Sequence, residues 1–259
     1  MKESLLQVRN ISRHFVLKKN ILSRKRIIHA VRDVSFDLYK GETLGLVGES
    51  GSGKTTVSNL ILRLLEANEG EIVFDGKKIS HLKEKELRSL RKDIQIIFQY
   101  SNAVLDPLMT IEELLGEALR IHSVVPENEL DREVDRLLFL VGLSSTERLK
   151  YPNQLSGGQN QRVIIARAIA VRPKLIVCDE PVSALDVSVQ GQILNLLSEL
   201  KTELNLSYLF ISHDLKVVRH LCDRIAVMYK GQIVETGPRD KILEQPDHDY
   251  TRHLIQSEL

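Results

Sequence analysis

The sequence predicts an α/β fold with a mainly parallel sheet and an inserted helical subdomain. Short apolar runs alternate with helical patterns along the chain, which is typical of α/β proteins. Several runs are apolar along most of their length, and this favours central strands that are covered on both faces. Between about residues 100 and 154 the strand pattern disappears and only helical patterns remain. We therefore expect strands and helices that alternate around one helical insertion.

The strand pattern occurs in nine segments. The four most uniformly apolar ones are expected to lie at the centre of the sheet, and they are residues 43–47, 94–98, 175–179 and 207–212. The other expected strands are 5–9, 34–38, 71–74 and 224–228, with a last short hairpin strand at 232–235.

Helical periodicity predicts the remaining elements. Residues 187–204 place six apolar side chains on one stripe at a spacing of three or four, and these are Val189, Ile193, Leu196, Leu197, Leu200 and Leu204. A helix is also expected at 54–65, directly after a glycine-rich loop, and another at 160–171. The insertion is expected to contain helices at 111–121 and 127–141.

The composition limits the classes of function. The formal net charge of the 259 residues is +1, which gives no reason to expect a nucleic-acid partner. The two cysteines, Cys178 and Cys222, form neither a disulfide framework nor a metal set, and they suit a reducing cytosol. No stretch approaches the ~18 uncharged apolar residues of a membrane helix. If the protein acts at a membrane, we expect other chains to span it.

Residues 48–55, here called the phosphate loop, match the pattern Gly-x-x-x-x-Gly-Lys-[Ser/Thr] between an expected strand and an expected helix. The glycines let backbone N–H groups point inward at phosphate oxygens, and the helix adds its positive N-terminal end. Lys54 is expected to reach the β- and γ-phosphates, and Thr55 to offer a hydroxyl to Mg²⁺. The residues expected to bind the nucleotide here are Gly48, Glu49, Ser50, Gly51, Ser52, Gly53, Lys54, Thr55 and Thr56.

Two carboxylates follow the apolar run 175–178. Asp179, at the end of the expected strand, is predicted to hold Mg²⁺, and Glu180 is predicted to polarise the attacking water. A strand end capped by two solvated acids is the alternative. The presence of the phosphate loop upstream favours the catalytic interpretation.

Residues 155–159 read Leu-Ser-Gly-Gly-Gln and open an expected helix. Ser156 is suited to cap the helix, and Gly157 and Gly158 expose backbone N–H groups. The segment therefore predicts a second anion site, in which Gln159 is also included. The pentapeptide resembles the signature motif of ABC ATPases. The resemblance implies a dimer in which each ATP lies between the phosphate loop of one subunit and the signature helix of the other.

Further residues match the family in order. Gln99 resembles the glutamine that reaches Mg²⁺ and the water, and His213 resembles the switch histidine that contacts the γ-phosphate. Asp186, in the run 183–186, resembles the D-loop aspartate at the dimer interface. Phe15 lies where the family places an aromatic ring that stacks on adenine. Without the family, Phe15 and His213 would be interpreted as packing or surface residues.

The resemblance extends over nearly the whole chain. It implies a P-loop NTPase (RecA-like) core with a mainly parallel sheet, an N-terminal antiparallel β subdomain and an inserted α-helical subdomain. We expect one ABC ATPase domain over 1–259, with the nucleotide-binding core at 1–99 and 155–235. The helical subdomain is expected at 100–154 and a C-terminal helical tail at 236–259.

The segments 29–31, 35–43, 231–237 and 246–252 resemble the ATPases of oligopeptide, dipeptide and nickel importers. The resemblance implies ATP hydrolysis at the cytoplasmic face of the membrane, with Mg²⁺, a second ATPase subunit, two permease subunits and, indirectly, an extracellular solute-binding protein. Peptide and nickel chelate both remain open as the solute, and the partner ATPase is either an identical or a related chain. An exporter ATPase, a regulatory module without catalysis and a non-transport ABC ATPase are the alternatives. No iron–sulfur cluster is expected, because the cysteines that hold it in many relatives are missing. Residues 100–107 differ from the commoner sequence after Gln99, which leaves the channel contact open.

Overall fold

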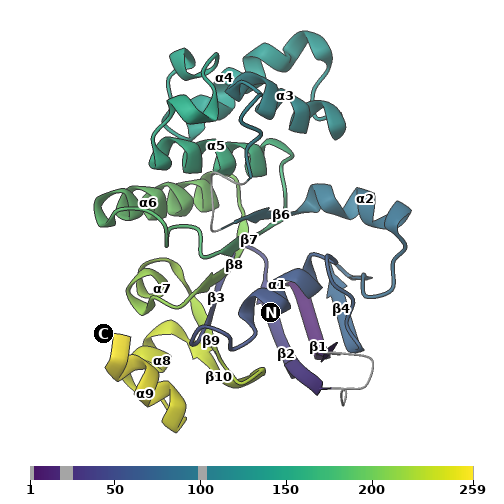
Figure 1. Ribbon diagram of the computed structural model, residues 1–259, viewed down its shortest axis with the longest axis vertical. Helices are drawn as coiled ribbons and strands as arrows, with labels where there is room; N and C mark the ends of the chain where they lie inside the picture. Colours follow the sequence, from purple (N-terminus) through teal and green to yellow (C-terminus); the bar gives the residue numbers. More distant parts are fainter. Residues whose placement is uncertain (1–2, 18–25, 99–103, 259) are drawn as a thin grey trace. The chain divides into compact units, whose positions relative to one another are not determined.

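The computed structural model describes residues 3–17, 26–98 and 104–258. The chain divides into two compact units (Figure 1). The first unit contains the residues up to Arg88 and those from Leu209 onward, and the second unit contains Ser89–Tyr208. The domain boundaries expected from the sequence remain predictions.

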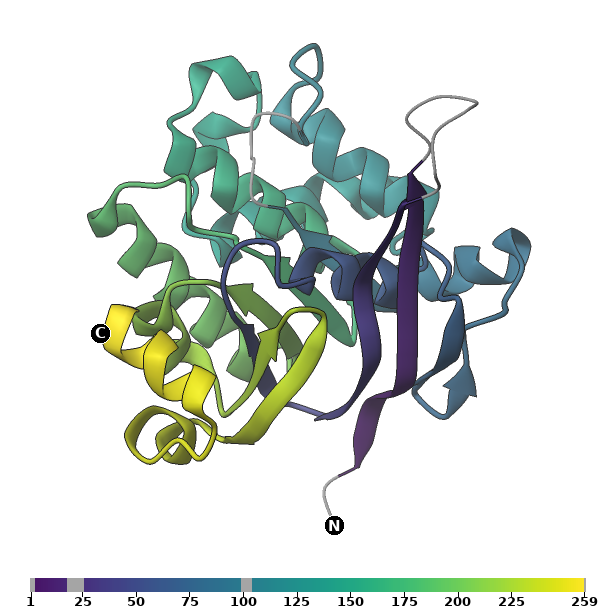
Figure 2. The same ribbon diagram turned by 60° about the horizontal axis from the view of Figure 1, so that its bottom comes forward.

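An antiparallel sheet forms the N-terminal part of the first unit. It contains the strands β1 (Ser4–Leu17), β2 (Arg26–Tyr39), β4 (Glu69–Phe74) and β5 (Lys77–Lys78), in the order β2-β1-β4-β5. Figure 2 shows β1 and β2 as two long strands side by side. Its core is apolar, since Val8 pairs with both Phe36 and Ile72 and all three are buried. The expected antiparallel sheet at the N-terminus is thus confirmed.

Both long strands extend beyond the predicted ranges, which were wrong at these ends. The β1 register shifts between Val8 and Ile11, and Asn10 between them has a φ of 50°. A bulge of this kind breaks the period-two alternation of side chains. The apolar pattern therefore ends near residue 9, while the pairing with β2 continues.

Six strands form the second sheet, in the order β10-β9-β3-β8-β7-β6. They are β3 (Thr43–Val47), β6 (Ile94–Ile97), β7 (Leu175–Asp179), β8 (Ser207–Ser212), β9 (Arg224–Tyr229) and β10 (Gln232–Pro238). β3 pairs in parallel with β9, and β6 with β7, whereas β10 is antiparallel to β9. β3, β7 and β8 are buried throughout, as the uniformly apolar runs predicted. The expectation of a central strand at 94–98 was wrong, because β6 lies at the edge of the described sheet and is only partly buried.

The first unit contains the helices α1 (Lys54–Ile61), α7 (Leu215–Leu221), α8 (Arg239–Glu244) and α9 (Asp249–Glu258), and α2 (Glu84–Asp93) leads out of it. α1 ends earlier than the predicted residue 65. The chain turns at Arg63, whose φ is 55°. α8 and α9 belong to the expected C-terminal tail and lie beside α7 (Figure 2).

The second unit contains α3 (Ile111–Ile121), α4 (Leu130–Leu140), α5 (Gly157–Ala170) and α6 (Val187–Glu203). Three single-turn 3₁₀ helices lie among them, at Glu127–Glu129, Ser145–Glu147 and Pro152–Gln154. The expected helix at 111–121 is confirmed, and that at 127–141 begins with a 3₁₀ turn. Within 104–154 the described chain contains helices and turns and no strand. No helix of the described ranges has the length and apolarity to span a membrane.

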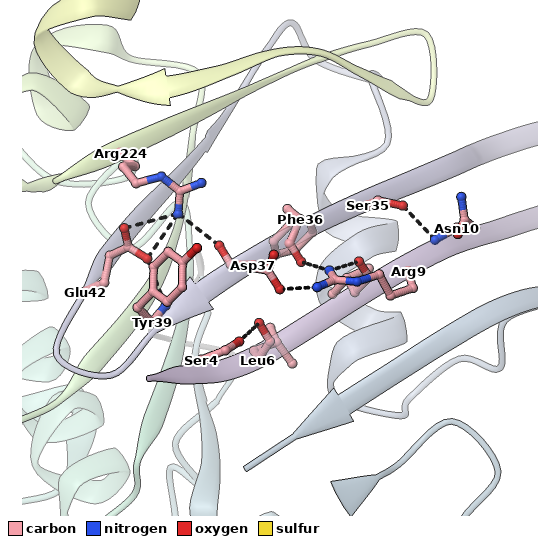
Figure 3. A network of polar contacts seen from close by, with 11 residues as sticks. Ser4, Leu6, Arg9, Asn10, Ser35, Phe36, Asp37, Tyr39, Glu42 and Arg224 are labelled. Atoms are coloured by element: carbon pink, nitrogen blue, oxygen red, sulfur yellow. Dashed lines mark hydrogen bonds and ion pairs between the residues drawn. The ribbon is translucent and has the colours of Figure 1, made fainter. Parts of the chain in front are cut away.

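An ion pair ties β9 to the start of β3 within the first unit (Figure 3). The Arg224 guanidinium donates to the Glu42 carboxylate at 3.2 and 3.3 Å and to the Asp37 carbonyl at 3.1 Å. It also lies over the Tyr39 ring, 5.4 Å from the ring centre. Glu42 is buried, so the pair fixes the entry to β3 and thereby the strand that leads into the phosphate loop.

Candidate functional site

The phosphate loop connects β3 to α1, and its glycines are required by its geometry. Gly48, Gly51 and Gly53 have φ values of 149°, 79° and 110°. A Cβ on Gly48 would lie 2.1 Å from the Met228 carbonyl oxygen, and one on Gly53 would lie 2.3 Å from the Ala30 carbonyl oxygen. The curled loop therefore packs on the backbone of β9 and β2, where a side chain does not fit.

Lys54 begins α1 and is buried, with 5% of its surface exposed. Its ammonium donates to the carbonyl oxygens of Gly48 at 2.7 Å and Glu49 at 2.9 Å. A buried cation needs such polar partners. Since the N-terminal end of α1 also carries positive partial charge, the start of this helix favours an anion.

Other groups of the loop fit a polyphosphate. The Ser52 hydroxyl is buried and has no hydrogen-bond partner among the described residues. Glu49, Ser50 and Thr55 are exposed, and Thr56 is half-buried. A buried ammonium, an orphaned hydroxyl and a turn of backbone N–H groups together form a cradle for phosphate oxygens.

His213 follows β8 in the first unit and is exposed. Its two neighbours fix the backbone there. The Asp214 carboxylate accepts from the Lys216 and Val217 N–H groups at 2.8 and 3.4 Å, and the Ser212 hydroxyl accepts from the Asp214 N–H at 3.0 Å. The imidazole is thus carried on a capped turn directly after a sheet strand.

Asp179 is the last residue of β7 in the second unit, and Glu180 follows it. Asp179 is buried, with 8% exposure, and Glu180 is half-buried. The φ of Glu180 is 50°, a left-handed conformation that costs about 1–2 kcal/mol for a residue with a side chain. The preceding Cys178 is a buried small side chain, and burial together with the Asp179 charge raises the pKa of its thiol.

The segment 155–159 forms a capped helix start in the second unit. The Ser156 hydroxyl accepts from the Gln159 N–H at 3.2 Å, and the Gln159 side-chain oxygen accepts from the Ser156 N–H at 3.0 Å. This is a capping box at the N-terminus of α5. Gly157 is exposed, whereas a Cβ on Gly158 would lie 2.6 Å from a methyl group of Val189 on α6. Gly158 therefore also permits close packing of two helices.

The remaining expected site residues are Asp186, Phe15 and Gln99. Asp186 is exposed and is the residue before the first turn of α6. Phe15 is half-buried on β1, and the Arg13 guanidinium lies over its ring, 4.9 Å from the ring centre. An adenine would therefore have to stack on the part of the ring that Arg13 does not cover. Gln99 lies outside the described residues.

Two groups that support the phosphate loop were not predicted from the sequence. The Gly231 N–H donates to the Ser52 carbonyl at 2.9 Å, and the Tyr250 hydroxyl accepts from the Glu49 N–H at 3.1 Å. Tyr250 lies on α9, about two hundred residues after the loop. No spacing rule connects such distant positions. The segment 246–252 indicated only a subfamily, and no role was expected for its tyrosine.

A glycine-rich loop between a parallel strand and a helix, with a buried lysine at the helix start, defines a P-loop nucleotide-binding protein. The acidic end of β7 and the capped start of α5 are the further motifs of one family within this class. The sequence model of the ABC transporter family matches residues 31–183. The chain belongs to the ABC transporter family, and its predicted family and fold class are confirmed.

Relatives with known names are similar over nearly the whole chain. The glutathione import ATP-binding protein GsiA of Escherichia coli (strain K12) is 51% identical over 254 residues, which are 98% of this chain. That of Pectobacterium atrosepticum is 50% identical over 256 residues, again 98% of this chain. The chain spans 41% of the length of these relatives.

Solved structures show the same fold. A dimeric post-hydrolysis state of the ATP-binding cassette MJ0796, bound to ADP and Pi, matches with a TM-score of 0.78 and 31% identity, over 91% of this chain and 99% of that one. The cbiO1 protein of Clostridium perfringens, part of the ABC transporter complex cbiONQ, matches with a TM-score of 0.81 and 26% identity, over 100% of both chains.

Proposed function

We propose that this chain is the ATP-hydrolysing subunit of an ABC importer, and that it powers the uptake of peptides or a related small solute through separate membrane subunits. The single observation that carries the proposal is the phosphate loop with its buried Lys54, on a chain that is about half identical to import ATP-binding proteins. The names of those relatives specify glutathione, which favours a peptide-like solute over a nickel chelate.

In this proposal the phosphate loop binds the triphosphate of ATP. Backbone N–H groups of the loop face the phosphate oxygens, apart from those of Glu49 and Ser52, which are bonded within the protein. The Lys54 ammonium, held by the Gly48 and Glu49 carbonyl oxygens, reaches the β- and γ-phosphates. Thr55, Asp179 and Gln99 would hold Mg²⁺, which supplies charge neutralisation when bound. Oxygen donors of this kind suit Mg²⁺ because it keeps several waters and phosphate oxygens as ligands.

Hydrolysis depends on positioning, because phosphoryl transfer to water needs little covalent help from the protein. Glu180 orients and polarises the attacking water, and His213 contacts the γ-phosphate. Glu180 directly follows Asp179, so the two proposed roles fall on adjacent residues at the end of β7. Phe15 stacks on the adenine with the part of its ring that Arg13 leaves free.

The second anion site requires a second subunit. The capped N-terminus of α5, with Ser156 and the exposed Gly157, presents donors that one nucleotide in its own loop does not need. We propose that it completes the nucleotide site of a partner ATPase, identical or related, with Asp186 near the shared interface. The dimeric structure of MJ0796 supports this arrangement. Two permease subunits, and indirectly a solute-binding protein, complete the importer, and the ATPase lies at the cytoplasmic face of the membrane.

The experiment compares wild type with Glu180→Gln. Wild type should hydrolyse ATP with Mg²⁺, and the variant should bind ATP, hydrolyse it more slowly by about 10²-fold or more, and accumulate as a dimer on size exclusion. Glu199→Gln, which neutralises an exposed carboxylate on α6, is the matched control and should retain wild-type turnover. Normal turnover in Glu180→Gln would remove this residue from its role, and absence of ATP binding by wild type would refute the function itself.

A further inference from the structure

The C-terminal helix α9 contacts the phosphate loop through one hydroxyl. The Tyr250 hydroxyl accepts a hydrogen bond from the Glu49 backbone N–H at 3.1 Å. Glu49 is the second residue of the loop, directly after the glycine that packs on β9. A residue of the tail thus binds the backbone of the loop that we propose to bind ATP.

Tyr250 and Lys54 bind opposite ends of the same peptide unit. The peptide between Gly48 and Glu49 offers its N–H to Tyr250 and its C=O to the Lys54 ammonium, at 2.7 Å. Because a peptide unit is planar and rigid, fixing the direction of its N–H also fixes that of its carbonyl. The tyrosine hydroxyl therefore sets the orientation of the carbonyl that holds the ammonium of the phosphate-binding lysine.

Tyr250 is itself held firmly. Its ring stacks on that of Tyr229, with ring centres 4.0 Å apart and planes inclined by 28°. Its N–H donates to the His248 side chain at 3.1 Å. The buried Glu235 carboxylate accepts from the N–H groups of Asp247 and His248 at 2.9 and 3.1 Å, which anchors the start of α9 on β10.

The turn after β9 bonds a second residue of the phosphate loop. Tyr229 ends β9, and two residues later the Gly231 N–H donates to the Ser52 carbonyl at 2.9 Å. Two residues of the loop are thus bonded to neighbouring groups: Glu49 to Tyr250, which stacks on Tyr229, and Ser52 to the turn that follows Tyr229. Such a connection reduces the number of conformations that the loop samples before a ligand arrives.

We propose that Tyr250 is a positioning residue that preorganises the phosphate loop for the nucleotide, so that the C-terminal tail contributes to ATP affinity. This inference rests on the proposed function. The hydroxyl touches the Glu49 N–H and acts on the ligand only through the loop backbone. Its loss should therefore weaken nucleotide binding and raise the KM for ATP, while kcat stays unchanged.

The test compares Tyr250→Phe with Tyr39→Phe in the full chain. Tyr250→Phe keeps the ring on Tyr229 and removes only the hydroxyl, with its contacts to Glu49. Tyr39→Phe removes a phenolic hydroxyl in the same unit, where the ring packs under Arg224. We expect Tyr250→Phe to raise the Kd for a non-hydrolysable ATP analogue and the KM for ATP about 2- to 10-fold, the worth of one hydrogen bond. Tyr39→Phe should change neither.

A second readout needs no nucleotide. Hydrogen exchange of the Glu49 amide should be faster in Tyr250→Phe than in wild type, with an unchanged thermal midpoint. Unchanged exchange, an unchanged Kd, or a fall in kcat with the KM constant would each overturn the inference. If wild type binds the analogue and Tyr250→Phe binds it equally well, only the inference fails. If wild type does not bind it, the proposed function fails as well.

Discussion

The Arg224 guanidinium donates to both oxygens of the Glu42 carboxylate, at 3.2 and 3.3 Å, and so joins β9 to the residue that precedes β3 (Figure 3). The side chain of Glu42 is 2% exposed and that of Arg224 24% exposed. An ion pair in such surroundings depends on both partners, because a charge left alone there is poorly solvated. Its position makes it a support for the strand that leads into the phosphate loop.

We predict that Arg224→Met lowers the free energy of unfolding by about 2–3 kcal/mol, because Glu42 is left buried without its cation. The exposed pair Arg120–Glu127 offers a matched control, and Arg120→Met should cost less than about 1 kcal/mol. Chemical denaturation measures both. The double variant Glu42→Gln/Arg224→Met should lose less than the sum of its single variants. Additive losses would show that the pair is not coupled.

Substitutions at two glycines of the phosphate loop distinguish the cost of a steric clash from the cost of backbone strain. Both Gly53 and Gly51 have a positive φ, but only at Gly53 would a Cβ meet a backbone atom, 2.3 Å away, whereas nothing lies within 4 Å of one at Gly51. Gly51→Ala should cost about 1–2 kcal/mol of folding free energy. Gly53→Ala should cost about 3–5 kcal/mol and abolish ATP binding. Thermal unfolding and nucleotide titration measure these effects, and equal losses in the two variants would contradict the account.

A carboxylate on β10 bonds the start of the tail, and its ionisation stabilises the fold. Burial alone would raise the pKa of Glu235, but the Thr251 side chain, the Asp247 and His248 N–H groups and the nearby Lys241 charge outweigh it and lower the pKa. A group with a lowered folded pKa stabilises the protein above its unfolded pKa, about 4.3 for Glu, and loses that contribution as the pH falls through the folded value.

We therefore predict that Glu235→Gln is less stable than wild type at neutral pH, and that the difference shrinks as the pH falls below about 4.3. Thermal unfolding across that range checks it. Glu244→Gln, at an exposed position on α8, should be close to wild type throughout. A difference for Glu235→Gln that grows toward acid pH would be the wrong sign.

Local patterns predicted the elements and the motifs well. The strands at 43–47, 175–179 and 207–212 occur with the predicted bounds, because a strand buried on both faces is apolar throughout. The loop glycines and the helix start at Ser156 were also predictable, since each motif lies within a few consecutive residues. The ends of β1 and α1 were not. A bulge interrupts the alternation of side chains in β1 while the pairing with β2 continues, and the left-handed Arg63 follows α1 while the apolar pattern continues to residue 65.

Long-range support could not be predicted from the sequence. Tyr250 reaches Glu49, and Arg224 reaches Glu42, across about two hundred residues of chain. A tyrosine or an arginine carries no local mark of such a partner. Only the fold, which brings α9 and β9 to the loop and to the start of β3, shows which residues support the site.

The central proposal is that a nucleotide in one phosphate loop is completed by the segment 155–159 of a second molecule. Chains that carry Ser50→Cys and chains that carry Ser156→Cys are mixed, both in the Glu180→Gln background, and oxidised with and without ATP. The native cysteines Cys178 and Cys222 are buried and should not react. We predict a disulfide between the two kinds of chain that forms only with ATP. A cross-link that forms in equal yield without ATP would contradict the account. So would the absence of a cross-link in a sample that binds ATP, whether the chain is tested alone or reassembled with its partner ATPase.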